Sequence, residues 1–127
     1  MKKSRYYLTS LIKLFLIFML AGCVSKGKIL PKNLPDATLN KPYYAEIYIQ
    51  LSPVIDRIFD YRIEPKNSGL ELAPFDLDAK HAYNHLTIKG TPLVTGTIVI
   101  KMHGITLDTL HQPAEEFEKT YTINVEQ

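Results

Sequence analysis

Apolar and polar side chains alternate with a period of two through most of the chain after residue 36, and this alternation restricts the possible folds more than any other feature. Between residues 43 and 51, one face of the alternation carries Tyr43, Ala45, Ile47, Ile49 and Leu51. Successive side chains of a strand point to opposite faces, so this segment predicts a half-buried β-strand.

The same alternation predicts five further strands, at residues 58–63, 70–72, 86–88, 97–102 and 120–126. Their apolar faces comprise Phe59, Tyr61 and Ile63; Ile98, Ile100 and Met102; and Tyr121, Ile123 and Val125. Turn signals such as Asn67-Ser68-Gly69 separate them. Residues 104–119 show little pattern, and a helix of about two turns at 113–119 is one reading of them. Short strands between turn signals are typical of an all-β sandwich or barrel, and 127 residues leave room for one domain.

The first 23 residues, MKKSRYYLTSLIKLFLIFMLAGC, have the three parts of a secretory signal. Lys2, Lys3 and Arg5 form a positive start, residues 14–20 form an unbroken apolar run, and small residues follow. The run is shorter than the about 20 apolar residues that a stable membrane span requires. We therefore expect residues 1–22 to be a cleaved signal peptide. An uncleaved anchoring helix is the alternative, and the lysine that interrupts the apolar segment disfavours it.

Leu20-Ala21-Gly22-Cys23 resembles the lipobox of bacterial lipoproteins at every position. A cysteine thiolate is the nucleophile that takes up a diacylglyceryl group, and the small Ala21 and Gly22 leave the bond before Cys23 open to a signal peptidase. The resemblance implies that Cys23, the single cysteine, becomes the lipid-carrying first residue of the mature protein. Residues 23–35 then hold the lipidated cysteine and a proline-containing tether, and residues 36–127 form the folded domain.

Localisation follows from the same resemblance. Val24 stands where an aspartate commonly retains Gram-negative lipoproteins in the inner membrane. The expected place is therefore the cell envelope: the outer membrane, facing the periplasm, for a Gram-negative source, and the cell membrane for a Gram-positive one. Four of the 15 basic residues precede Cys23 and all 13 acidic residues follow it, so the mature part has 11 basic residues and a net charge of −2. Nothing in that balance favours nucleic-acid binding.

Several phrases, in order, resemble the immunoglobulin-like module of bacterial surface proteins known as He_PIG. They begin with Leu34-Pro35, Ala37-Thr38 and Pro42-Tyr43, and continue with Phe59 to Ile63, Leu77-Asp78, Gly90-Thr91-Pro92, Gly96-Thr97 and Tyr121 to Val125. The resemblance implies that the all-β domain is an immunoglobulin-like β-sandwich. That module commonly occurs in tandem arrays, whereas this chain carries one copy behind a lipid anchor.

Catalytic and metal-binding patterns are weak. His81 and His85 are four residues apart, a spacing that suits a metal only on a helix, and no HExxH motif is present. Neither Ser52 nor Ser68, the serines considered as nucleophiles, stands in a GxSxG or SxxK motif, and no carboxylate pair is singled out for glycoside hydrolysis. We expect no enzymatic activity, no catalytic residues, no metal and no cofactor beyond the covalent lipid.

A calcium site formed by four aspartates is the alternative, because calcium binds clustered carboxylates in related sandwiches. The four aspartates are Asp56, Asp60, Asp76 and Asp78. Their spacing matches no calcium loop, so we expect Asp76 and Asp78 to be turn formers instead.

The leading functional hypothesis is a membrane-anchored envelope lipoprotein that acts as a non-catalytic protein-interaction module. Its expected partners are the membrane, through the anchor, and another envelope protein that binds a sheet face or edge. The alternative is a carbohydrate-binding or adhesin-like surface module. Tyr44 and Tyr48, which the alternation turns outward, are the candidate ligand contacts for it, although cross-strand packing accounts for them more simply.

Overall fold

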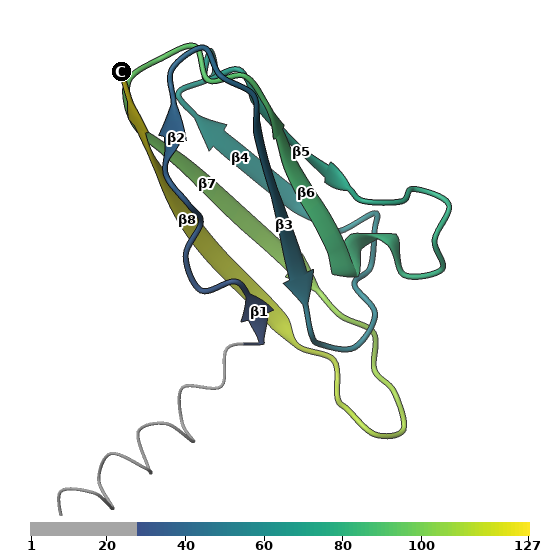
Figure 1. The fold of residues 1–127 in the computed structure, drawn as a ribbon. Helices are drawn as coiled ribbons and strands as arrows, with labels where there is room; N and C mark the ends of the chain where they lie inside the picture. Colours follow the sequence, from purple (N-terminus) through teal and green to yellow (C-terminus); the bar gives the residue numbers. More distant parts are fainter. Residues whose placement is uncertain (1–27) are drawn as a thin grey trace, which may run out of the picture.

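The computed structural model describes residues 28–127, which form two four-stranded β-sheets in one small domain (Figure 1). The strands are β1 (Ile29–Leu30), β2 (Ala37–Thr38), β3 (Tyr43–Ile49), β4 (Asp60–Glu64), β5 (Leu70–Pro74), β6 (His85–Gly90), β7 (Gly96–Ile105) and β8 (Glu116–Glu126), with a 3-10 helix η1 (Ala82–Asn84) before β6. The first sheet has the order β1-β3-β6-β5 and the second β2-β8-β7-β4. This arrangement confirms the predicted all-β class and β-sandwich architecture.

The core lies between the two sheets and uses the apolar faces that the alternation predicted. Ile47, Leu86 and Ile88 of the first sheet and Ile98, Ile100 and Ile123 of the second sheet have no exposed surface. Burying an aliphatic side chain of this size contributes about 1.5–3 kcal/mol. Opposed isoleucines and leucines on the two inner faces therefore supply much of the force that holds the sheets together.

Strand β4 departs from the predicted half-buried pattern. It lies at the edge of the second sheet, where Tyr61 is 42% exposed and Ile63 is only partly buried. The intervening residues Asp60, Arg62 and Glu64 are charged and exposed. Charged side chains on an edge strand discourage pairing with another chain, so β4 protects the sheet edge more than it fills the core.

The prediction that residues 23–35 form a tether is wrong for residues 28–35, which are bound to the sandwich. Ile29 and Leu30 form β1 and pair with Ile49 and Tyr48 of β3. Leu34 is buried among the core side chains. The backbone hydrogen bonds and apolar burial of this segment outweigh the preference of its prolines for extended, solvated chain. The earlier residues, including Leu20, Ala21, Gly22 and Cys23 and the predicted signal peptide, lie outside the described residues.

The prediction of a long connection at residues 104–119 is also wrong, and no helix forms at residues 113–119. Strand β7 ends at Ile105 and strand β8 begins at Glu116, so the loop between them covers only residues 106–115. The pairing includes Gly104 with Phe117, and a Cβ on Gly104 would lie 2.5 Å from the Phe117 ring. This glycine interrupts the apolar alternation in the sequence because it makes room for the aromatic side chain opposite.

The two ends of the sandwich differ. The loops at 50–59, 75–84 and 106–115 gather at the end where β1 begins, which we call the loop end, and the C-terminus lies at the opposite end (Figure 1). Among residues 28–127, no helix has the length and hydrophobicity needed to cross a membrane.

Two tyrosine hydroxyls fasten residues 28–35 to the sheets. Tyr43 donates a hydrogen bond to the carbonyl of Pro35 at 2.8 Å, and Tyr121 donates to the carbonyl of Pro31. Burial raises the pKa of Tyr43 to about 12, with a further contribution from Asp36, and burial alone raises the pKa of Tyr121 to about 12. Both phenols are therefore held in the protonated form when the domain is folded.

Alkaline pH is expected to destabilise the domain through these two phenols. Because their folded pKa values lie above the ordinary value of 10.0, their contribution is complete below pH 10 and is lost as pH rises toward about 12. Urea unfolding from pH 9 to 12 should show this fall in the free energy of unfolding. The Tyr43→Phe/Tyr121→Phe variant should show a shallower fall, and an unchanged slope would contradict the assignment.

Candidate functional site

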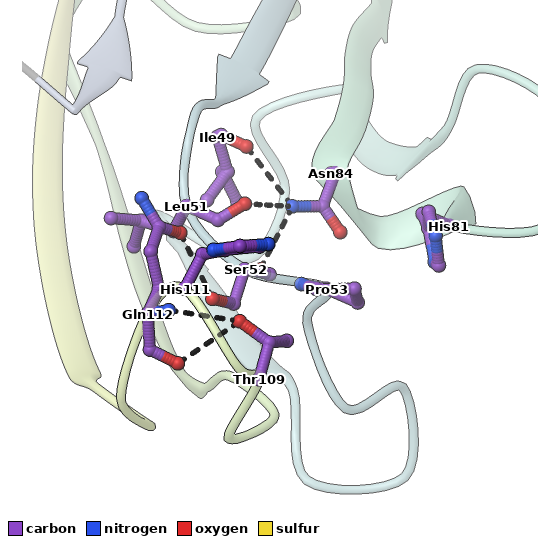
Figure 2. A pocket seen from close by; sticks show the side chains of 9 residues that line it. All are labelled: Ile49, Leu51, Ser52, Pro53, His81, Asn84, Thr109, His111 and Gln112. Atoms are coloured by element: carbon purple, nitrogen blue, oxygen red, sulfur yellow. Dashed lines mark hydrogen bonds between the residues drawn. The ribbon is translucent and has the colours of Figure 1, made fainter.

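A pocket of about 580 Å³ opens at the loop end, between the end of β3 and two loops that are distant in sequence (Figure 2). Its walls are Ile49, Leu51, Ser52 and Pro53 from the β3–β4 connection, His81 and Asn84 around η1, and Thr109, His111 and Gln112 from the β7–β8 loop. The lining combines apolar side chains with a few amides, hydroxyls and imidazoles. That mixture is typical of sites that bind small ligands or a partner's side chain.

Asn84 organises this pocket. Its side-chain nitrogen donates to the carbonyl oxygens of Ile49 at 3.0 Å, Ser52 at 3.2 Å and Leu51 at 3.5 Å (Figure 2). Its side-chain oxygen accepts from the Val54 backbone N–H at 2.9 Å. One amide thus satisfies the backbone of a connection that has left the sheet. Helix η1 places Asn84 there immediately before β6 begins.

The opposite wall is closed by contacts within the β7–β8 loop. The Thr109 hydroxyl donates to the Gln112 carbonyl at 3.0 Å and accepts from the Gln112 backbone N–H at 3.0 Å. The Ser52 hydroxyl donates to the Gln112 side-chain oxygen at 3.0 Å, which links the two walls. Ser52 is therefore engaged with an amide rather than with a histidine that could act as its base.

The outer face of the first sheet carries a second candidate surface. Tyr48 of β3, His85 of β6 and Phe75 just after β5 form a stacked row, with centroids 4.4 Å apart in each neighbouring pair and planes inclined by 19° and 14°. This spacing is close to the distance between neighbouring strands, about 4.7–4.9 Å, as expected for rings carried by β3, by β6 and by the residue that directly follows β5. Glu46 anchors the middle ring through a 3.0 Å contact between its carboxylate and His85 Nε2.

Leu30 of β1 extends the row to the remaining strand of the sheet. It is the register partner of Tyr48, and directly opposed residues of an antiparallel pair share one face. We call Leu30, Tyr48, His85 and Phe75 the outer band. Leu30, Tyr48 and Phe75 are 37%, 42% and 56% exposed, so the band is an apolar, largely aromatic surface open to solvent.

The alternation in the sequence predicts one member of this band, Tyr48, and not the others. Tyr44 and Tyr48 both face outward, at 55% and 42% exposure, in agreement with the alternation of β3. The structure places Tyr48 in the outer band, where one of its faces is covered by His85. Phe75 and His85 were not predicted as members, since no periodicity links them to Tyr48 and only the strand register does.

The histidines and aspartates considered as alternative metal ligands do not converge. Among residues 28–127 no three His, Cys, Asp or Glu side chains are arranged to hold a metal ion. His81 lines the pocket while His85 stacks in the outer band. Asp76 accepts a hydrogen bond from the Asp78 backbone N–H at 3.0 Å, which is the turn-forming role predicted for this pair.

The fold defines a small all-β sandwich domain with two candidate binding surfaces at one end, the pocket and the outer band. No protein-family model, curated protein or solved structure matches the chain.

Proposed function

We propose that the protein is a membrane-anchored envelope lipoprotein that acts as a non-catalytic protein-interaction module, with another envelope protein as its partner. The lipobox Leu20-Ala21-Gly22-Cys23 supports the anchor and the envelope location. The outer band supports the interaction role, and it is the observation on which this proposal chiefly rests. We propose the outer membrane, facing the periplasm, for a Gram-negative source.

The outer band has the properties of a protein-binding surface. Aromatic side chains are enriched at the centres of interfaces, where a few of them carry most of the binding energy. The three stacked rings hold one another in place and Glu46 fixes the middle ring, so little side-chain freedom is left to lose on binding. A partner with an apolar surface rimmed by polar groups fits this band.

The band favours a protein partner over a carbohydrate. A sugar ring stacks on the face of an aromatic ring, and His85 covers one face of Tyr48 while Tyr48 and Phe75 both cover His85. Stacking therefore leaves His85 without a free face and covers one face each of Tyr48 and Phe75, which reduces the ring area on which a sugar could stack. Tyr44, which is 55% exposed, is the remaining candidate for the carbohydrate alternative.

Site-specific photocrosslinking in cells tests this proposal. A photoreactive aromatic residue at Phe75 is expected to give one discrete protein adduct, and the same residue at Leu93, which is 61% exposed at the opposite end, is expected to give none. Tyr48→Ala should reduce the Phe75 adduct about tenfold or more, as loss of an interface hot spot does. Equal labelling at both positions, or recovery of glycan without protein, would overturn the proposal.

A further inference from the structure

The β7–β8 loop presents two leucines to solvent at the loop end. Leu110 is 100% exposed and Leu107 is 48% exposed. The loop extends beyond the sheets below β7 and β8 (Figure 1). Its shape is held by the Thr109–Gln112 hydrogen bonds and by a 2.8 Å bond from the Leu107 N–H to the Pro53 carbonyl. The leucines are therefore displayed by an ordered turn.

The chain enters the sandwich beside this same loop. The Lys28 ammonium group lies 3.0 and 3.1 Å from the two carboxylate oxygens of Glu115, the last residue of the loop. The Lys28 carbonyl accepts a hydrogen bond from the Gln50 N–H at 2.6 Å. These contacts place the start of the described domain beside Glu115 at the base of the β7–β8 loop, and therefore at the same end of the sandwich as the exposed leucines.

The length of chain before Lys28 limits how far the domain can stand from an anchor at Cys23. Five residue steps separate Cys23 from Lys28, and a fully extended chain covers at most about 18 Å in that number. The following segment cannot lengthen this reach, because residues 29–30 pair with β3 and Leu34 is buried in the core. A lipid-anchored domain must therefore keep its loop end close to the bilayer.

We infer that the β7–β8 loop docks on the lipid bilayer that holds the acyl chains of Cys23, with Leu107 and Leu110 inserted among the headgroups. The inference rests on the proposed lipidation. The charges of the loop permit this placement: Glu115 is paired with Lys28, and Asp108 is the one formally charged residue between the two leucines. Exposed apolar side chains at an interface add affinity to an acyl anchor.

Docking in this way fixes the orientation of the domain. Strand β8 has 11 residues and rises by about 3.3 Å per residue, so the two ends of the sandwich are separated by about 33 Å. The end with Leu93 and the C-terminus then points away from the membrane. The outer band stands on the flank near the loop end, in reach of a partner that is itself bound to the membrane.

Single tryptophans provide the test, because the chain has none of its own. Leu110→Trp and the matched control Leu93→Trp place the reporter on exposed leucines at opposite ends. Each variant is purified as the lipidated full protein and inserted into phosphatidylethanolamine–phosphatidylglycerol vesicles whose acyl chains carry bromine near the headgroup. We expect a blue-shifted emission and several-fold stronger quenching at position 110 than at position 93.

The outcomes separate docking from anchoring. Intact-mass measurement shows whether Cys23 carries lipid, and an unmodified cysteine would overturn the lipoprotein proposal together with the docking inference. Lipidated protein with equal or negligible quenching at both positions would overturn the docking inference alone. Adding Leu107→Asp to Leu110→Trp should lower the quenching in lipidated protein, and unchanged quenching would contradict insertion of this loop.

Discussion

Gly90→Ala is expected to destabilise the domain by about 3 kcal/mol, combining backbone strain with a steric conflict. Gly90 ends β6 with φ 138°, a conformation that L side chains rarely adopt. An added Cβ would lie 2.2 Å from the carbonyl oxygen of Gly69, which belongs to the turn before β5. Relief of that contact requires the backbone of β5 or its turn to move.

Gly96→Ala is the matched control. Gly96 also has a positive φ, 99°, but an added Cβ would find no atom within 4 Å. Its expected loss is about 1–2 kcal/mol, the strain of the backbone alone. Urea unfolding of residues 24–127 measures both variants, and equal losses would show that the contact between Gly90 and Gly69 has no energetic weight of its own.

Asn84→Ala is expected to cost about 3 kcal/mol, because each buried backbone group left without a partner costs about 1–3 kcal/mol. The substitution removes the acceptor for the Val54 N–H and the donor shared by three carbonyls of the β3–β4 connection. We also expect faster amide hydrogen exchange at residues 50–58, since Asn84 holds this connection against the sandwich. The pocket should lose its shape in the same variant.

Asn124→Ala controls for removing an amide. Asn124 is exposed, and its side-chain oxygen makes a single 3.4 Å contact with the Thr97 hydroxyl. Substitutions of this kind usually change stability by less than about 0.5 kcal/mol. Similar losses for the two alanine variants, or unchanged exchange at residues 50–58 in Asn84→Ala, would contradict the role assigned to Asn84.

Much of the sandwich was predictable because strand periodicity is a local property. The alternation in β3, β7 and β8 identified the buried faces before any pairing was known, and Ile47, Ile98 and Ile123 lie in the core as expected. The prediction failed where a local pattern was interrupted for a non-local reason. Gly104 breaks the alternation of β7 because it faces Phe117 on β8, and the sequence carries no sign of that pairing.

The candidate sites depended more strongly on tertiary structure. Tyr48 could be predicted to face outward, but the ring that stacks on it, His85, lies on β6, and Phe75, which stacks on His85, follows β5. The sequence carries no periodicity or motif that singles out Asn84, because its partners lie in a segment more than thirty residues earlier. A signal did exist in its place next to a strand, since asparagine often satisfies backbone groups in turns.

By itself, the sequence determined the strand character of the chain, the inward faces of its main strands and the resemblance of residues 20–23 to a lipobox. Only the tertiary structure decided that residues 28–35 belong to the sandwich, that the outer band runs across one sheet from β1 to the residue after β5, and that Lys28 lies beside Glu115 of the β7–β8 loop. The physical reason is the range of the interactions. Side-chain alternation follows from the geometry of neighbouring peptide units, whereas register and docking follow from packing between segments far apart in the chain.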